Sequence, residues 1–258
     1  MRTTLLFAEK ALRQQGRDVV GTLLTLLTTP LFTILYGLLA PEGAAGPPAG
    51  PVRAFDVYVP GMLVFSVIMI VFSSSLGLAR EIESGAMRRV RSWPVSAASV
   101  LAGGGLVHLA LAAIGAALVL ASARVLGFQP SVGLPAVLFL SVLGAVSSIG
   151  VGVGVAALTD TQGRAFLVAS VVMFLLLLFS GVVFPRPVVR LVTIGGVVLG
   201  PFDLLPTTHL HAAFARLMSG GDLASVKLRI LALALLSMVY FAAGVLVFRR
   251  RHGVGVGA

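Results

Sequence analysis

The chain has 258 residues, of which 58% are hydrophobic and 11% charged, and its mean hydropathy is +1.05. Soluble domains carry about 25% charged residues, so this composition excludes a soluble globular protein and predicts a polytopic membrane protein. The formal net charge is +10, but most Lys and Arg residues flank apolar stretches, which favours membrane topology and anionic lipid over nucleic acid as the explanation.

Six apolar stretches have the length of about 20 residues that a helix needs to cross the hydrocarbon core of a bilayer. The N-terminal segment before them, MRTTLLFAEKALRQQGRD, lacks a continuous apolar region and a small-residue cleavage site, so no cleaved signal peptide is expected. We therefore predict an all-α integral membrane protein with a single transmembrane domain. Its spans are predicted over residues 19–40, 57–79, 100–123, 135–158, 165–184 and 230–248.

The distribution of basic residues predicts the orientation of these spans. If the N-terminus is inside, twelve Lys and Arg residues fall inside and seven outside, which together are the 19 in the sequence. Basic residues near span ends favour the cytoplasmic side. We therefore predict a multi-pass protein of a bacterial cytoplasmic membrane with both termini in the cytoplasm, where Arg249, Arg250 and Arg251 anchor the last span.

Two segments on the outer side do not fit the pattern of full spans. Residues 41–51, PEGAAGPPAGP, are rich in Pro, Gly and Ala and are expected to form a flexible loop. Residues 191–202 are apolar but too short to cross, and prolines punctuate the sequence around them. We predict that residues 185–227 are an extracytoplasmic region with short re-entrant or interfacial helices.

Residues for catalysis, metal binding or ion coupling are sparse. The chain has no Cys and no GxxxxGK[ST] phosphate loop. His108 is the only ionisable residue deep in a predicted span, and a polar helix contact is favoured over a proton relay. The glycines of residues 150–154 are interpreted as helix packing rather than a dinucleotide loop, and His209-Leu-His211 as a solvated loop rather than a metal site. An intramembrane enzyme and an ion-coupled carrier are therefore disfavoured.

The segment 80–99 is different, because it concentrates charge in an otherwise apolar chain. Residues 85–91 can form a short helix with Arg88 and Arg91 on one face and Met87 and Val90 on another, and Trp93-Pro94 would stop it at the interface. An ordinary positive-inside loop explains the arginines alone. The complete pattern favours a docking element, with these candidate residues: Glu81, Glu83, Gly85, Met87, Arg88, Arg89, Arg91, Trp93, Pro94 and Val95.

This segment carries a resemblance to a known family. It resembles a motif of the membrane permeases of ABC-2 type exporters, most of all the daunorubicin/doxorubicin drug-resistance branch, at these residues: Glu81 or Glu83, Gly85, Arg89, Arg91, Pro94, Val95 and Ser96. Three further stretches agree in order: YVPGML at residues 58–63, SGVVFP at 180–185 and GPF at 200–202. The sequence departs from the family pattern at Trp93, at Ala97-Ala98 after the serine, and at Gly200, where the family commonly has Asn.

The resemblance implies a mechanism and partners. It implies a pair of permease chains, identical or different, above two ATPase subunits that hold ATP and Mg, while this chain itself carries no catalytic residue, cofactor or metal. Residues 80–99 would be the cytoplasmic coupling helix, and residues 1–18 an interfacial helix that places Leu5, Leu6, Ala8 and Leu12 against Glu9, Lys10 and Arg13.

A substrate pathway is expected between the two permease chains. Its candidate lining residues are Phe32, Tyr36, Met62, Phe65, Met69, Phe72, Met173 and Phe179. Aromatic and Met surfaces bind varied apolar molecules by repacking, although each of these residues could instead face lipid or another helix. The expected cargo is a hydrophobic drug, a natural product or a lipid-like molecule. The alternatives are lipid- or polysaccharide-linked cargo and, less favoured, ion-coupled transport.

Overall fold

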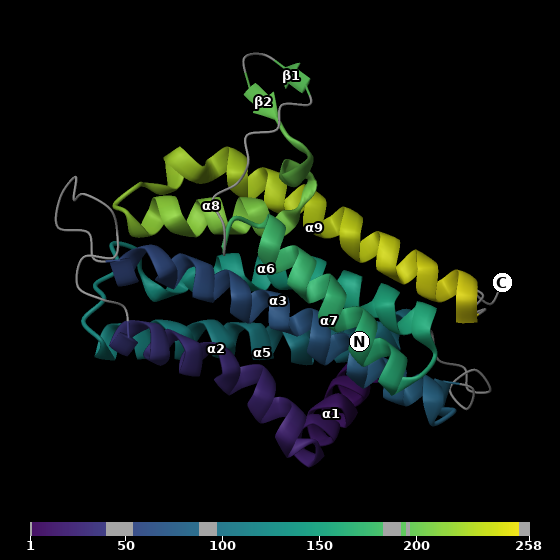
Figure 1. Cartoon of the computed structure of the whole chain (residues 1–258). Coiled ribbons are helices and arrows are strands. Elements are labelled where there is room, and N and C mark those ends of the chain that lie inside the picture. Colours follow the sequence, from purple (N-terminus) through teal and green to yellow (C-terminus); the bar gives the residue numbers. More distant parts are fainter. Residues whose placement is uncertain (1, 40–53, 88–96, 183–191, 195–196, 253–258) are drawn as a thin grey trace.

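The computed structural model describes residues 2–39, 54–87, 97–182, 192–194 and 197–252. Within them, six helices are long and apolar enough to cross a membrane, which confirms the predicted all-α fold with six spans. They are α2 (Val19–Leu39), α3 (Ala54–Glu83), α5 (Ala97–Val125), α6 (Leu134–Thr159), α7 (Gln162–Phe179) and α9 (Leu223–His252) (Figure 1).

Two of these helices form the centre of the bundle. About two thirds of the spanning part of α3 is buried inside the chain, and 61% of that of α6. The corresponding fractions are 22% for α2, 11% for α7 and 17% for α9, whose exposed side chains are largely Leu, Val and Phe. Because lipid tails are as apolar as these side chains, the outer helices remain stable with their apolar faces uncovered by protein.

Glycine allows the closest helix contact in the bundle, between α6 and α9. A Cβ atom added to Gly244 would overlap the carbonyl oxygen of Gly150, and one added to Gly150 would overlap the backbone of Phe241. Without a hydrophobic driving force in lipid, helices associate through this kind of close van der Waals packing. The interpretation of the glycines at 150–154 as packing residues is confirmed.

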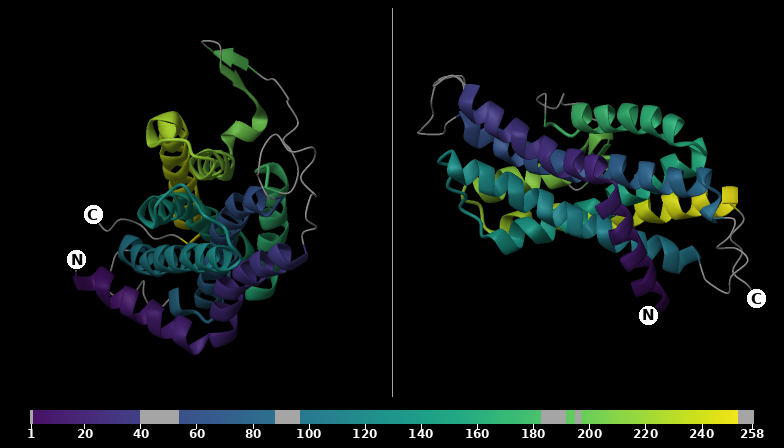
Figure 2. Two further views of the ribbon diagram at one scale, coloured as in Figure 1. Left: turned by 90° about the vertical axis from the view of Figure 1, so that its left-hand side faces the viewer. Right: turned by 90° about the horizontal axis from the view of Figure 1, so that it is seen from below.

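The N-terminal helix α1 (Arg2–Arg17) leaves the bundle at a sharp elbow (Figures 1 and 2). Asp18 separates it from α2 and accepts a hydrogen bond from the Gly21 N–H at 3.2 Å. A carboxylate in this position satisfies a free N–H of the new helix and favours its positive end. The start of α1 and the end of α9 lie toward the same end of the bundle, as an even number of spans requires.

Several boundaries differ from those expected from hydropathy. The second span continues as helix to Glu83, the fifth ends at Phe179 rather than 184, and the sixth begins at Leu223 rather than 230. Gly181 follows the end of α7 with a left-handed φ of +83°, a conformation that ends helices. At the end of α3 and the start of α9, the helix includes charged residues that lie beyond the apolar stretch, and a hydropathy window detects only the apolar stretch.

The prediction of a re-entrant helix within residues 191–202 was wrong for this segment. Strands β1 (Val192–Ile194) and β2 (Val197–Leu199) pair antiparallel, with Ile194 opposite Val197, and project from the bundle (Figure 1). β-branched residues on both sides of Gly195-Gly196 give the pattern of a two-residue hairpin. The 3₁₀ helix η1 (Pro201–Leu204) and α8 (Pro206–Met218) follow, and α8 packs its buried Leu210 and Phe214 against α3, α6 and α9. Whether α8 enters the bilayer stays a prediction.

Candidate coupling site at the elbow end

Four of the ten candidate coupling residues lie in the described part of the chain. Glu81 and Glu83 occupy the last turn of α3, and Gly85 and Met87 follow it. The other six lie outside the described residues: Arg88, Arg89, Arg91, Trp93, Pro94 and Val95.

Gly85 ends α3 and redirects the chain. Its φ is +70°, in the left-handed region that favours glycine, and its N–H donates to the Ile82 carbonyl at 3.0 Å. The chain is helical again at 86–87, and the half-buried Met87 packs against the main hydrophobic core. The segment that begins at Gly85 is therefore joined to the bundle by a tight turn and by an apolar contact.

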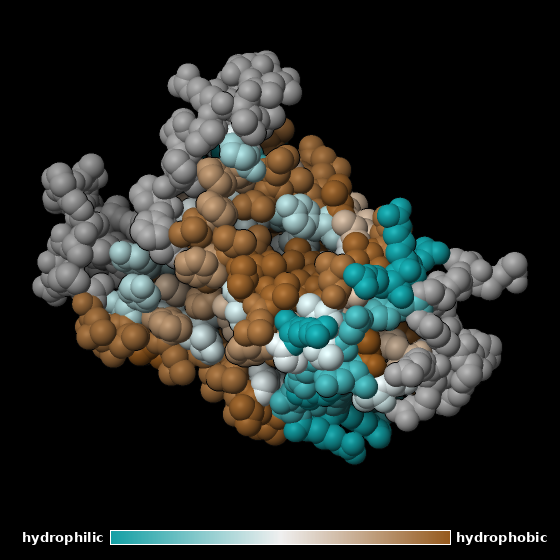
Figure 3. All heavy atoms as spheres, turned by 45° about the vertical axis from the view of Figure 1, so that its right-hand side comes forward, coloured by the Kyte–Doolittle hydropathy of each residue, from teal (hydrophilic) through white to brown (hydrophobic). Residues whose placement is uncertain are grey.

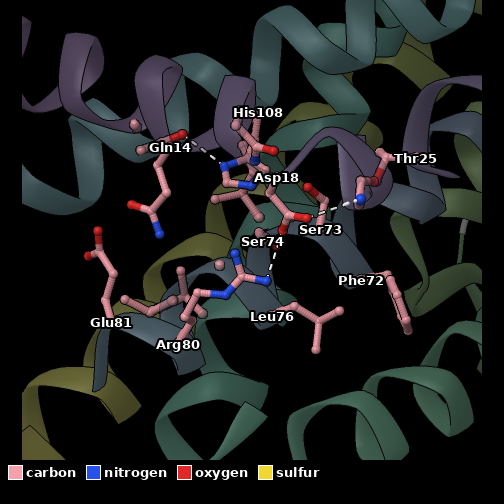
Figure 4. A pocket seen from close by; sticks show the side chains of 18 of the residues that line it. Gln14, Asp18, Thr25, Phe72, Ser73, Ser74, Leu76, Arg80, Glu81 and His108 are labelled. Carbon is pink, nitrogen blue, oxygen red and sulfur yellow. Dashed lines mark hydrogen bonds and ion pairs between the residues drawn. The ribbon is translucent and has the colours of Figure 1, made fainter. Parts of the chain in front are cut away.

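Two ion pairs join the end of α3 to the elbow, and Figure 4 shows the one between Arg80 and Asp18. The Arg80 guanidinium lies 2.9 Å from the Asp18 carboxylate, and the Lys10 ammonium lies 2.9 Å from Glu81. These groups are 18–47% exposed, and such pairs contribute only about 1 kcal/mol or less to stability. Their main consequence is positional, because they hold α1 and the start of α2 against the end of α3.

A third contact joins the same end of α3 to α7. The Glu83 carboxylate accepts a hydrogen bond from the backbone N–H of Gln162 at 2.8 Å. Gln162 is the first residue of α7, where helix N–H groups lack partners within the helix and the helix dipole favours negative charge. Glu81 and Glu83 thus both bind other parts of their own chain, and α3 connects through them to α1 and to α7.

The end of the bundle where α1 meets the end of α3, which we call the elbow end, also carries most of the exposed charged residues among those that the structure describes. In Figure 3 hydrophilic residues gather at one end of an otherwise largely apolar face. Exposed charged residues there come from α1 and from the end of α9: Glu9, Lys10, Arg13, Arg17, Arg249, Arg250 and Arg251. Helix α1 is amphipathic, and its location at the membrane interface stays a prediction.

Close backbone contact at Gly103 holds α1 against α5. A Cβ at Gly103 would lie 2.6 Å from the Phe7 Cβ and 2.8 Å from the Ala8 nitrogen. Neither atom can leave this overlap by a change of side-chain rotamer, because one is the first carbon of a side chain and the other is a backbone nitrogen. One of the two helices must therefore move.

We therefore expect Gly103→Leu to displace α1, although leucine is a better helix former than glycine. The measurement is thiol labelling of Ala11→Cys, a half-buried α1 position, which is selective because the chain has no native Cys. Labelling should become several-fold faster with Gly103→Leu. It should not change with Ala102→Leu, at the neighbouring exposed position, and equal rates in all three proteins would contradict the packing argument.

The predicted pathway residues do not form one surface of the chain. Met62 and Met69 are buried, at 8% and 7% exposure, and contribute to the interior of this subunit. Phe32 contacts Phe65, and Tyr36 stacks on Tyr58 at 5.2 Å, so aromatic pairs join α2 to α3. Of the remaining three, Phe72 packs against Phe166 and Phe179 stacks on Phe202, while Met173 is half-buried.

The interpretation of His209-Leu-His211 as a solvated loop was wrong. His209 lies in α8, is 7% exposed, and its Nε2 bonds to the Asp203 carbonyl at 2.8 Å. Proline at the first position of α8 favours a helix start here. Among the residues that the structure describes, no group of three or more His, Asp and Glu side chains could hold a metal ion.

Comparison with protein families gives the same assignment as the sequence motifs. The family model for the ABC-2 type transporter matches residues 3–195, which include α1, the end of α3 and the segment after it. This chain belongs to the ABC-2 type transporter family. The ABC-2 permease is thus the membrane component of an ABC transporter, not its catalytic domain, and the family implies a partner ATPase. No individual curated protein matches the chain.

Sequence reasoning missed three residues of the candidate coupling site: Lys10, Asp18 and Gln162. Each contacts a residue of the α3 end that is more than 60 positions away in sequence. Only Asp18 has a local signal, as a capping residue between two helical stretches. The other two become visible only when the fold brings α1 and α7 to the end of α3.

Proposed function

We propose that this ABC-2 permease is the transmembrane subunit of an ATP-driven exporter of the drug-resistance type. Two permease chains would pair above two ATPase subunits, which bind ATP and Mg. The cargo would be a hydrophobic drug, a natural product or a lipid-like molecule, taken from the cytoplasm or inner leaflet. The elbow end would face the cytoplasm of a bacterial cell, with both chain termini on that side.

One observation carries this proposal. The residues at the end of α3 contact two parts of the chain that are distant in sequence: Arg80 and Glu81 contact the α1–α2 elbow, and Glu83 contacts the start of α7. A segment that only anchored topology would need charge but no such contacts. The connections support a role in which the segment transmits force from the ATPase.

The unequal burial of the helices supports a direction for this motion. α3 and α6 are held inside the bundle, whereas α2 and α7 bury only 22% and 11% of their spanning parts. ATPase closure would push on the segment that begins at Gly85, and the contacts at the α3 end would pass the displacement to α2 and α7. A ligand-driven shift between two packed arrangements of this kind is a common switching device.

Exposed aromatic residues of the moving helices support an apolar cargo. Phe32 and Tyr36 on α2 are 43% and 42% exposed, and Phe179 at the end of α7 is 37% exposed. Few charged side chains accompany them, which disfavours a sugar-rich molecule. The pathway would be lined by these residues, while Met62 and Met69 would act from inside the subunit.

The test is co-expression with the candidate partner ATPase, followed by pull-down through a tag on the permease. We expect the wild type to retain the ATPase and the triple variant Arg88→Glu, Arg89→Glu, Arg91→Glu to lose it. A matched control carries the same charge change in predicted outside segments, at Arg186, Arg190 and Arg216, and should retain the ATPase. Equal retention by all three proteins would refute the docking role of the segment.

A second measurement separates ATP-driven from ion-coupled transport. Inverted vesicles that contain both subunits should accumulate a hydrophobic fluorescent cargo when ATP is added. This uptake should survive an uncoupler that collapses the proton gradient. Uptake that stops with the uncoupler while ATP is still present would instead support the ion-coupled carrier.

A further inference from the structure

A partly open cavity of about 300 Å³ lies in the angle of the elbow, bordered by α1, α2, α3 and α5 and reached by residues of α6 and α7 (Figure 4). The described residues that line it are polar at one side and apolar at the other. Charged groups stand near the α3 end, whereas apolar side chains line other parts of the cavity, among them Leu24, Phe72, Val100, Ile149 and Phe166. The cavity therefore suits a molecule with a polar head and an apolar body.

Three glycines keep this space open. A Cβ atom on Gly77, Gly104 or Gly105 would meet no atom within 4 Å, and all three line the cavity. Glycine inside a helix costs about 1 kcal/mol relative to alanine. At Gly103 this cost is offset because α1 can approach closely. Gly77, Gly104 and Gly105 allow no such close contact, so the consequence of having glycine at these positions is that the cavity stays unfilled.

His108 places one unpartnered polar atom at the wall of this cavity. It lines the cavity, and its ring lies there in Figure 4. Nδ1 donates to the Gly104 carbonyl at 2.8 Å, while Nε2 is buried beside the backbone of Ser73 but makes no hydrogen bond within the described chain. The histidine as a whole is partly buried, and its Nε2 atom is shielded from solvent. When Nδ1 of a neutral imidazole carries the proton, Nε2 is an acceptor, so it matches a ligand hydroxyl or amide N–H.

The charged rim is electrically balanced. Of the described residues that line the cavity, four carry a full charge, and they form two ion pairs, Lys10 with Glu81 and Asp18 with Arg80. A purely anionic or cationic head group would meet a like charge as often as an opposite one. A zwitterionic or neutral polar head can instead meet partners of both signs.

We propose that this cavity binds one single-chain amphiphile with a zwitterionic or neutral head group. A hydroxyl or amide N–H beside the head group would donate a hydrogen bond to His108 Nε2. The chain of the ligand lies along Gly77, Gly104 and Gly105, and its head lies at the rim. This inference rests on the proposed export function, because the cavity would be where amphipathic cargo is taken from the inner leaflet.

The first measurement is photolabelling of the full-length permease in phosphatidylcholine nanodiscs, without ATPase. The probe is lysophosphatidylcholine with a diazirine in its acyl chain, and labelled peptides are mapped by mass spectrometry. We expect saturable labelling of peptides that contain residues 72–81 and 100–108. Gly105→Leu and, from the other helix, Gly77→Leu should each reduce it about tenfold because leucine fills the space. The probe should label Ala110→Leu, a variant at an exposed site of α5, to the same extent as the wild type.

A second probe tests the role of His108. The 2-deoxy analogue of the same lysolipid lacks the hydroxyl beside the head group, and we expect it to label the wild type several-fold less. His108→Phe should label equally with both probes, and His108→Gln, which keeps an acceptor, should restore part of the difference. Equal labelling of the wild type by both probes would overturn the assignment to Nε2, and undiminished labelling of both glycine variants would overturn the site.

Transport assays keep this inference separate from the proposed function. If labelling is specific but Gly105→Leu exports as well as the wild type with ATPase present, the role of the site in loading cargo is overturned while ATP-driven export stands. If neither protein shows ATP-dependent export although labelling is specific, the proposed function fails and the binding site stands.

Discussion

Arg80→Glu is expected to uncouple ATP hydrolysis from transport in this ABC-2 permease. The substitution removes the 2.9 Å pair with Asp18 and places a third carboxylate near Asp18 and Glu81, so like charges would separate the elbow from α3. Cargo moved per ATP hydrolysed in proteoliposomes should fall about tenfold, which corresponds to roughly 1.4 kcal/mol of lost coupling. ATPase retention should stay intact, because Arg80 pairs with Asp18 of its own chain and is not one of the candidate docking residues.

A charge exchange tests whether the pair itself carries this effect. Asp18→Arg combined with Arg80→Asp reverses both charges and should recover much of the lost transport. Arg124→Glu makes the same charge change on an exposed residue at the opposite end of α5, and it should leave the transport ratio near the wild-type value. Normal transport per ATP in Arg80→Glu would show that the elbow plays no part in coupling.

Gly244→Leu is expected to lower the stability of the helix bundle more than any of the other substitutions proposed above. Its Cβ would overlap the Gly150 carbonyl oxygen, and backbone atoms cannot escape by changing rotamer, so α6 and α9 must separate. Overpacking of this kind costs about 3 kcal/mol or more. The midpoint of thermal unfolding in detergent should fall by several degrees, and most of the protein should be lost during purification if the helices part.

Gly16→Leu is the matched control for this substitution. Gly16 is an exposed helical glycine whose Cβ would meet no atom within 4 Å, so leucine should leave stability unchanged or raise it slightly through helix propensity. If Gly244→Leu and Gly16→Leu unfold at the same temperature, the close contact of α6 and α9 is not a determinant of stability.

Sequence reasoning predicted the six spans because bilayer thickness imposes a length that hydropathy detects directly. It placed helix ends less well, because a helix can continue outside the hydrocarbon core. α3 continues through Arg80 and Glu83, and α9 begins before Lys227 and Arg229. In each case charged residues remain helical at the end of an apolar stretch, and hydropathy reports only the apolar part.

The hairpin at 192–199 was missed although its signal was present. The sequence VTIGGVVL has β-branched residues around a two-glycine turn, but the membrane context favoured an interpretation by length alone. The contacts of Glu81 and Glu83 are a different case. Their partners Lys10 and Gln162 are 71 and 79 positions away, and no local pattern specifies such a pairing. The role of Gly104 and Gly105 likewise depends on the position of α1, α2 and α3 around them.

The most direct test of the central claim asks which end of the bundle meets the ATPase. Ser84→Cys places a thiol on an exposed residue just after α3, and Ser131→Cys places one on an exposed residue between α5 and α6, at the other end. Each variant is labelled with a benzophenone maleimide, which is selective in a chain without Cys, and irradiated in membranes that contain the ATPase. We expect Ser84→Cys to cross-link to the ATPase, with a yield that changes when ATP is added, and Ser131→Cys not to cross-link. Cross-linking from Ser131→Cys alone would contradict the account.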